Sequence, residues 1–230
     1  MPNKLQQLAK VRARKGFTLV ELLISMAIFV SFLGVVTTSY VSIVRAQRDA
    51  NDVRKMYSEL RNVIDVVSDS IRESAVDYGC YNPAEQSGID LYDPNRCLEN
   101  AVSPIVGGQT TVLALVKKDG LEKTIFKIDG AKLVQKRWQK TSVGWEAVPG
   151  YEEYVPLNTD LLSLEGVNFR IFPHVNPYSN DPKVFGNSAF QFQPKVGLFL
   201  LVKNGVNAKS DFQLRYQTTI STRVYNRSDS

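Results

Sequence analysis

An uncharged and mostly apolar run occupies residues 22–44, and it constrains the fold of this chain more than any other feature. Its 23 residues are enough to cross the hydrocarbon core of a membrane as a helix, which needs about 20. Gly16 is a small residue directly before Phe17, where the apolar region starts. A secretory signal instead has its small-residue cleavage site after the apolar region. Cleavage after Gly16 would therefore leave the apolar helix on the mature protein.

A basic leader precedes the apolar run. It contains five basic residues and no acidic one: Lys4, Lys10, Arg12, Arg14 and Lys15. By the positive-inside rule the leader stays in the cytoplasm, so the chain after Val44 lies outside the inner membrane. Taking these five from the 28 basic residues leaves 23, which equal the 23 acidic residues, so the mature chain has no net charge. The high pI therefore does not favour nucleic acid as a partner.

The residues Lys15-Gly16-Phe17-Thr18-Leu19-Val20-Glu21 resemble the N-terminus of type IV pilins and of type II secretion pseudopilins. The resemblance covers residues 14–44. It implies that a prepilin peptidase of the membrane cuts between Gly16 and Phe17 and methylates the new N-terminal Phe17. It also implies other pilin or pseudopilin subunits, an inner-membrane assembly platform and membrane lipid as partners.

Glu21 is a carboxylate inside the apolar segment that starts at Phe17, four residues after it. A charge inside a membrane span costs on the order of 3 kcal/mol on insertion scales. The resemblance implies that Glu21 of one subunit pairs with the Phe17 amine of a neighbour, which neutralises both charges and sets the axial register. The alternative is an ordinary anchor in which Glu21 reaches the lipid headgroups.

Helical patterning continues past the membrane segment. Apolar residues recur at steps of three and four: Val53, Met56, Leu60, Val63 or Ile64, Val67 and Ile71. Because no proline occurs between Phe17 and Asn82, one helix is predicted from Phe17 to about Asp77, with Gly79 as its C-cap. Gly34 and the run 37–39 are its weak points.

Cys80 and Cys97 are the only cysteines. Outside the cytoplasm, where disulfides persist, a bridge between them closes a loop of about 18 residues and adds roughly 3 kcal/mol of stability. Two free thiols are the alternative. Asp90, Asp93 and Asn95 in this loop offer oxygens to calcium, but their spacing matches no EF-hand, and a plain acidic loop is the preferred interpretation.

The apolar period changes to two after Thr110. Segments 111–117, 122–128 and 132–138, separated by Asp-Gly pairs, predict a meander of three antiparallel strands. Further strands are predicted at 166–172, at 196–203 as a buried central strand, and at 212–224 with one apolar and one polar face. The loop 173–188 is either a partner-contact loop or a plain insertion.

These patterns predict an α+β fold, in which the second half of a long helix packs on an antiparallel sheet. Four segments are expected: a cleaved leader (1–16), a transmembrane or filament-core helix (17–44), an amphipathic continuation (45–78) and an extracytoplasmic β-rich head (79–230). The protein is expected as a single-pass protein of the inner membrane and, after assembly, in a periplasmic or extracellular filament.

Catalysis has little support in the sequence. The chain has one histidine, His174, and no catalytic motif surrounds it. No G-x-G-x-x-G and no P-loop occurs. Strand packing explains Trp138 and Trp145 better than sugar stacking does. We therefore expect no enzyme, no cofactor and no metal site.

Three functions remain open. The first is a minor pilin or pseudopilin that polymerises through its helix and primes, caps or modifies a filament. The length of the chain favours this role, and the strand-rich head is similar in style to W-type pilins and J-type pseudopilins. The second is a major, adhesive pilin. The third is a membrane-anchored extracytoplasmic binding domain that never polymerises, in which Glu21→Ala leaves function intact.

Overall fold

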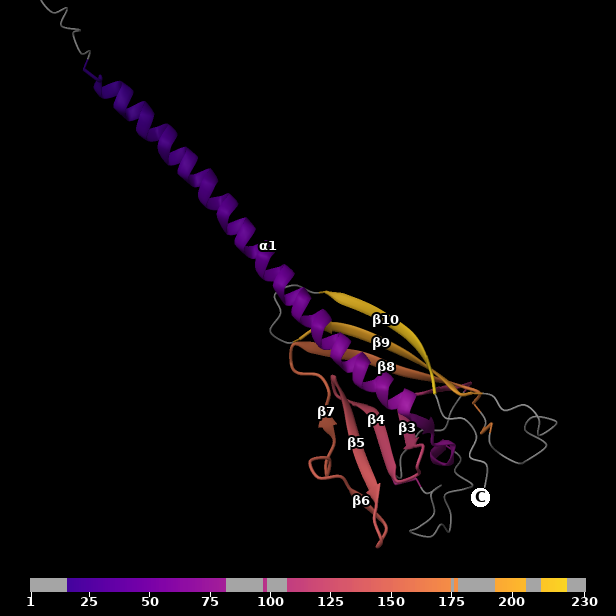
Figure 1. The fold of residues 1–230 in the computed structure, drawn as a ribbon. Helices are drawn as coiled ribbons and strands as arrows, with labels where there is room; N and C mark the ends of the chain where they lie inside the picture. Colours follow the sequence, from indigo (N-terminus) through magenta and orange to yellow (C-terminus); the bar gives the residue numbers. More distant parts are fainter. Residues whose placement is uncertain are drawn as a thin grey trace, which may run out of the picture. The chain divides into compact units, whose positions relative to one another are not determined.

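The computed structural model of this chain describes residues 16–81, 97–98, 107–174, 176–177, 193–205 and 212–222. The chain divides into two compact units, residues 1–50 and 51–230. One long N-terminal helix precedes the strands, and the described strand pairs are antiparallel (Figure 1). The α+β class predicted from the sequence is therefore confirmed. Residues 1–15 of the leader, and the loop with Asp90, Asp93 and Asn95, lie outside the described residues.

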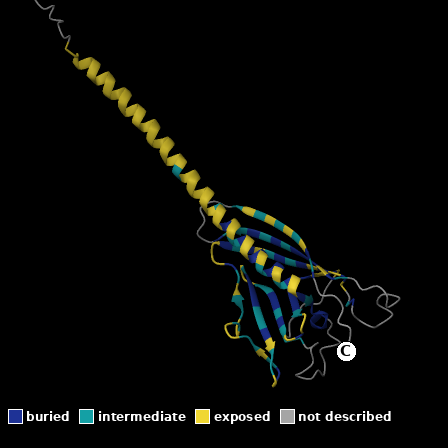
Figure 2. Ribbon diagram, in the orientation of Figure 1, coloured by how far each residue is buried: buried dark blue, intermediate teal, exposed yellow. Residues whose placement is uncertain are grey.

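Helix α1 runs from Leu19 to Glu73. The absence of proline lets the helical hydrogen bonding continue through both the apolar run and the amphipathic segment. Within the first unit, residues 16–43 are exposed (Figure 2). The helix has no break at Gly34 or at 37–39, the weak points expected from the sequence. The Thr38 hydroxyl donates a hydrogen bond to the Gly34 carbonyl, 2.7 Å away.

Within the second unit, α1 buries one stripe of side chains. The apolar residues Met56, Leu60, Val63, Ile64, Val67 and Ile71 are buried, and they recur at the spacing of one helix face. Val53, expected in the same stripe, is half-buried. The predicted amphipathic face therefore packs on the strand-rich part of the chain.

The helix ends four residues before the predicted Asp77. Strand β1 (Ser74–Val76) leaves the helix to pair with β3, and the N–H of Asp77 donates to the carbonyl of Ala114 at 3.0 Å. Pairing with β3 thus satisfies backbone groups that a longer helix would have bonded internally. Gly79 lies inside a 3₁₀ helix, η1 (Tyr78–Tyr81), so its prediction as the C-cap of α1 is wrong.

The predicted meander forms the centre of a six-stranded sheet in the order β1-β3-β4-β5-β6, with β7 also paired to β5. Its further strands are β3 (Val112–Lys117), β4 (Glu122–Asp129), β5 (Lys132–Lys140), β6 (Trp145–Ala147) and β7 (Val155–Pro156). The two Asp-Gly pairs make the turns as predicted, because Gly120 and Gly130 adopt positive φ values of 70° and 58°. The short strands β1, β6 and β7 were not predicted.

A second sheet of four strands has the order β10-β9-β8-β2, so the head has two sheets and not the single sheet expected. Its strands are β2 (Gln109–Thr110), β8 (Leu162–Phe172), β9 (Lys195–Asn204) and β10 (Gln213–Ser221). β9 lies between two neighbours, as predicted for the apolar segment 196–203. β8 starts at Leu162, before the predicted Gly166, because the strand continues through an irregularity between Leu164 and Gly166.

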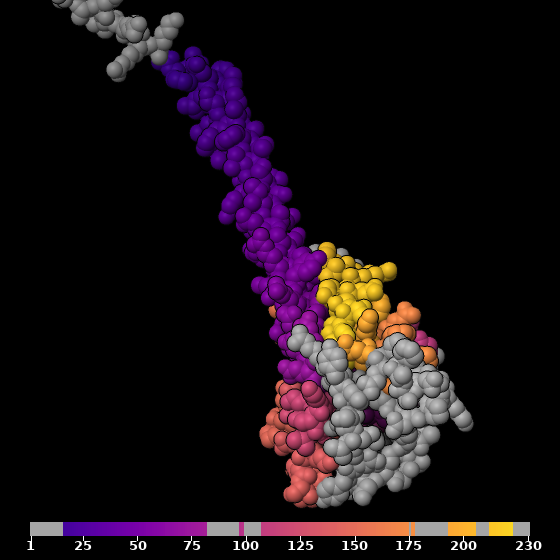
Figure 3. Space-filling view, turned by 45° about the vertical axis from the view of Figure 1, so that its right-hand side comes forward, coloured from indigo at the N-terminus to yellow at the C-terminus, as the bar shows by residue number. Residues whose placement is uncertain are grey.

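The amphipathic part of α1 and both sheets share one hydrophobic core. Its largest fully buried side chains include Met56 of α1, Phe126 of β4 and Phe169 of β8. Burial of a side chain of this size stabilises the fold by about 2 kcal/mol. Figure 3 shows β10, in yellow, at the surface beside α1.

Candidate functional site

The predicted processing residues immediately precede α1. Gly16, Phe17 and Thr18 lie before the helix, which begins at Leu19. All three residues are exposed, and the Phe17 side chain is 74% exposed. The bond between Gly16 and Phe17 therefore lies in an accessible, non-helical segment, as a protease needs.

Thr18 caps the helix. Its hydroxyl oxygen accepts a hydrogen bond from the N–H of Glu21 at 3.3 Å, and its carbonyl accepts one from the N–H of Leu22 at 3.2 Å. Threonine followed by glutamate three residues later is the sequence signature of a capping box. This role of Thr18 was not predicted, although the spacing carried the signal.

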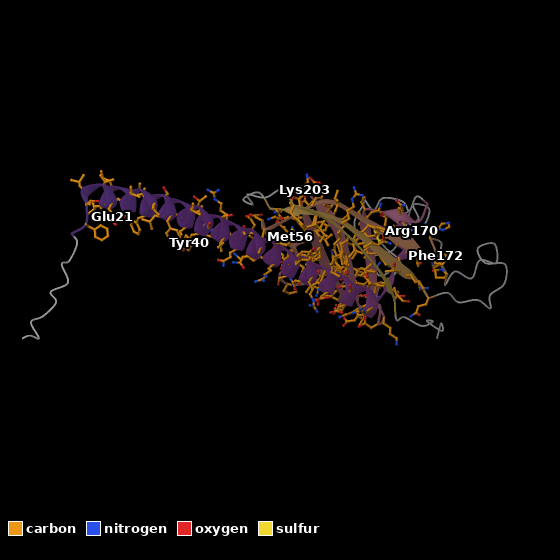
Figure 4. The ribbon with its side chains drawn as sticks, turned by 90° about the horizontal axis from the view of Figure 1, so that it is seen from above. Glu21, Tyr40, Met56, Arg170, Phe172 and Lys203 are labelled. Atoms are coloured by element: carbon orange, nitrogen blue, oxygen red, sulfur yellow. A yellow bond between two sulfur atoms is a disulfide. The ribbon has the colours of Figure 1, made fainter. Side chains whose placement is uncertain are left out.

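Glu21 lies in the first turn of α1 (Figure 4). The positive end of the helix dipole favours a carboxylate there. The Glu21 side chain is exposed, and within the described ranges its carboxylate has no hydrogen bond and no ion pair. Its carboxylate therefore remains available to a group outside this chain.

Four hydroxyl side chains within the apolar run form hydrogen bonds inside the helix. Ser25, Ser31, Thr38 and Ser39 each donate to the carbonyl four residues earlier, at distances of 2.7, 2.8, 2.7 and 2.9 Å. Such bonds remove the cost of placing a hydroxyl in hydrocarbon or in a protein interior. Glu21, by contrast, has no such bond for its carboxylate among the described residues.

By length and composition, α1 is the one helix among the described residues that is suited to cross a membrane. Its apolar side chains between Phe17 and Ile43 are exposed in the single chain, for example Ile28 at 65% and Phe32 at 63%. An apolar surface of this extent needs lipid or other protein to cover it. The helix start and this surface together form the candidate site for anchoring and assembly.

The second predicted pair of residues lies in the strand-rich unit. Cys80 of η1 and Cys97 form a disulfide with a Cα–Cα distance of 4.6 Å, so the alternative of two free thiols is wrong. Beside Cys80, Asp77 forms an ion pair with Lys123 of β4, whose ammonium also lies 5.4 Å from the centre of the Trp145 ring. Nothing local in the sequence signals this pair.

Tyr81 joins the disulfide region to β3. Its hydroxyl donates to the Val112 carbonyl at 3.0 Å and accepts from the Ala114 N–H at 2.7 Å. Burial raises the pKa of the Tyr81 hydroxyl well above its ordinary range, and the hydrogen bond from Ala114 opposes that rise only in part. These contacts give the region a structural role.

Two further expectations concern catalysis and ligands. Trp138 is 7% exposed and Trp145 contacts Lys123, so both pack within the head as the strand-packing interpretation expects. His174 is exposed just after β8. Within the described ranges, no group of three or more His, Cys, Asp or Glu side chains is arranged to hold a metal ion.

Comparison with protein families gives one match. Residues 11–37 match the model of the prokaryotic N-terminal methylation motif, which supports the type IV pilin and pseudopilin family. The motif implies processing by prepilin peptidase and assembly with other pilin subunits, and its proteins are generally structural subunits. Comparisons with curated proteins and with solved structures found no match.

Proposed function

We propose that this chain is a minor pilin or pseudopilin, made as a precursor, cut between Gly16 and Phe17, and assembled through α1 into a filament. The observation that carries the proposal is the start of α1. There, a methylation motif over residues 11–37 coincides with a capped helix whose Glu21 carboxylate has no partner within the described chain. The apolar surface that follows supplies the packing area of a filament core.

Assembly follows from the chemistry of the helix start. Cleavage after Gly16 creates a free amine on Phe17, one residue before the cap Thr18. Glu21 of one subunit pairs with the Phe17 amine of its neighbour. In a medium of low dielectric constant, an unpaired charge is costly, so subunits aligned with this pair are favoured over other axial positions.

The basic leader keeps the N-terminus in the cytoplasm, so the head folds on the far side of the inner membrane. The disulfide between Cys80 and Cys97 fits that compartment. Before assembly, lipid covers the apolar half of α1. After assembly, neighbouring helices cover it.

The minor role is the finer part of the proposal. The size of the head, with two sheets, favours a subunit that primes, caps or modifies a filament over the repeating main subunit. Such a subunit occurs at a small fraction of the main subunit. The copy number relative to the main subunit therefore separates a minor role from that of a major, adhesive pilin.

Gly16→Val tests the processing step. A Cβ placed on Gly16 meets no atom within 4 Å beyond its chain neighbours, so the substitution leaves the protein's own structure undisturbed. Its effect is therefore on recognition and cleavage by the peptidase. We expect the variant to accumulate in the membrane with the leader attached and to migrate more slowly than wild type. Gly34→Ala, at a second glycine whose Cβ meets no atom, is the matched control and should be processed normally. Equal mobility of wild type and Gly16→Val overturns the proposed cleavage.

A further inference from the structure

Strand β10 lies at the edge of the four-stranded sheet. The order β10-β9-β8-β2 gives it β9 as its one neighbour in that sheet, and its nine residues all pair with β9 without a bulge. At about 3.4 Å per residue, the strand presents an edge roughly 30 Å long. Figure 1 shows β10 as the outermost strand of its sheet.

The backbone groups of β10 point alternately toward β9 and away from it. At the two ends of the strand, the N–H of Asn204 donates to the Phe212 carbonyl, and the N–H of Thr222 donates to the Pro194 carbonyl. Given the pairing register, the even-numbered residues between these ends bond to β9, and the odd-numbered residues direct their N–H and C=O groups outward. No hydrogen bond from another described residue reaches these outward backbone groups. They belong to Gln213, Arg215, Gln217, Thr219 and Ser221.

This edge lacks the features that commonly prevent pairing with another chain, which are proline, a bulge, a short strand or several charges. β10 contains no proline, and Arg215 is its one charged residue. Its Tyr, Ile and Thr residues favour an extended backbone. The strand is therefore suited to the binding mode in which an extended peptide adds a strand to an open sheet edge.

The inner face of the sheet is covered less completely at β10 than at β9. Leu200 and Val202 of β9 are buried, whereas their partners Tyr216 and Leu214 on β10 are half-buried against the core. Figure 2 shows exposed and half-buried residues alternating along β10. Apolar side chains on an added strand would cover this row, and removing apolar surface from water is favourable.

The outer face of the same sheet is basic. Its four strands contain four basic residues and one acidic residue, namely Arg170, Lys195, Lys203, Arg215 and Glu165. Glu165 is already engaged, since it pairs with Lys203 at 2.5 Å and accepts a hydrogen bond from the Gln213 side chain at 3.2 Å. Arg170, Lys195 and Arg215 share the outer face by register, are exposed, and have no ion pair among the described residues.

We propose that an extended segment of a different protein of the filament adds to the free edge of β10 as a further strand. The outward backbone groups of β10 hold the segment by main-chain hydrogen bonds. A residue opposite Arg215 would have its Cβ about 5 Å from that of the arginine, so acidic side chains are favoured on the outer face. Apolar side chains are favoured on the inner face, beside Leu214 and Tyr216. The inference rests on the proposed filament function and names the chemistry of one partner of the head.

A second copy of this chain does not supply such a segment from its described strands. Its own β10 would bring a second Arg215 to the joint and no acidic residue. The other strands at or near the sheet edges, β1, β2, β6 and β7, have only two or three residues each. A subunit of low copy number also has other proteins of the filament as its neighbours, which is consistent with a different protein as the partner.

Photo-cross-linking of the full chain in filament-bearing membranes tests the strand addition. A photo-reactive phenylalanine analogue replaces Gln213, Gln217 or Ser221 in turn, which leaves Arg215 in place. Mass spectrometry should find all three products on one acidic segment of one different protein. Because paired strands advance together, the cross-linked position should move along that segment by about four residues at each step, in one direction. The analogue at Asp129, an exposed residue at the end of β4, is the control and should not join this segment.

Gln217→Pro then tests the backbone contact. Proline removes an N–H that β9 does not use, and proline is tolerated where the N–H of an edge strand faces solvent. With the analogue at Ser221, the cross-link should fall to background in Gln217→Pro and persist in the matched control Gln217→Ala. Arg215→Glu should lower the yield about fivefold, because like charges then lie opposite each other. Resistance of the head to protease shows that each variant is folded, and Arg215→Glu and the cross-link positions decide if Gln217→Pro is not.

The N-terminal peptide is read from the same membranes, so that the two proposals fail separately. With Phe17 processed, the contact is overturned by cross-links no stronger than the Asp129 control, by positions that do not advance in order, or by a segment without acidic residues. A second copy of this chain as the partner, or a cross-link that persists in folded Gln217→Pro, also overturns it. Each of these results leaves the filament function standing, whereas an unprocessed N-terminus counts against the filament function itself.

Discussion

Nζ of Lys123 and Oδ2 of Asp77 are 2.7 Å apart, and their side chains are only 3% and 6% exposed. The pair connects the segment that follows β1 to β4, next to the disulfide at Cys80. Two charges so far from water stabilise each other only while both are present. This region therefore depends on a contact between residues far apart in the sequence.

Lys123→Met should lower the free energy of unfolding by about 3–5 kcal/mol, because it leaves the Asp77 carboxylate buried without its cation. The matched control is Lys117→Met. Lys117 pairs with Glu122 at 2.7 Å, but these side chains are 39% and 40% exposed, so the loss should stay below about 1 kcal/mol. Chemical denaturation of the full chain in detergent measures both. Equal losses of unfolding free energy for the two variants would show that burial does not determine how much each ion pair contributes to stability.

The buried hydroxyl of Tyr81 should make the folded protein less stable at alkaline pH. Burial raises the pKa of its hydroxyl in the folded state, so the hydroxyl contributes stability that is fully present below the unfolded value near pH 10. That stability is lost as pH rises above 10, by about 1.4 kcal/mol per pH unit while only the unfolded state releases the proton. The readout is the difference in unfolding free energy between wild type and Tyr81→Phe from pH 9 to pH 11.5. A difference that does not change with pH contradicts the prediction.

The disulfide should contribute roughly 3 kcal/mol, since it closes a loop of about 18 residues. Cys80→Ser together with Cys97→Ser should lower the unfolding free energy by that amount and leave processing at Gly16 unchanged. Thiol labelling of unfolded wild type without reductant should find no free cysteine, since the structure pairs both. Labelling of both cysteines in that sample would mean that the bridge does not form in the cell.

Glu21→Gln removes the charge while keeping the size of the side chain. We expect processing between Gly16 and Phe17 to continue and incorporation into filaments to fall to background, because the Phe17 amine of the neighbour loses its counter-charge. Ser25→Ala is the matched control, one turn further along; its hydroxyl bonds only to its own helix, at the Glu21 carbonyl. Filament incorporation at the wild-type level in Glu21→Gln would favour the ordinary anchor.

Local patterns in the sequence predicted much of the helix and of the longer strands. The three-and-four spacing from Met56 to Ile71 gave the buried face of α1, and the alternation in residues 213–221 matches the alternating exposure of β10. The end of α1 was predicted wrongly because Ser74–Val76 form a strand that pairs with β3, a segment far along the chain. The division into two sheets depends in the same way on distant pairing.

In the candidate site, too, local sequence patterns predicted some residues, while others depend on contacts between distant parts of the chain. Gly16, Phe17 and Glu21 lie within seven consecutive residues of motif, and the Thr18 cap is readable from its spacing to Glu21. The Asp77–Lys123 pair was not predictable, because it requires β1, β3 and β4 to be neighbours.

The most direct test of the account is mass spectrometry of the N-terminal peptide in sheared surface filaments and in the envelope fraction. The account predicts a peptide that begins at methylated Phe17, present in filaments at a small fraction of the main subunit. Processed peptide confined to the envelope would point to a secretion pseudopilin or an initiation complex. An N-terminus at Met1 in every fraction would contradict processing and assembly, and would leave only a membrane anchor.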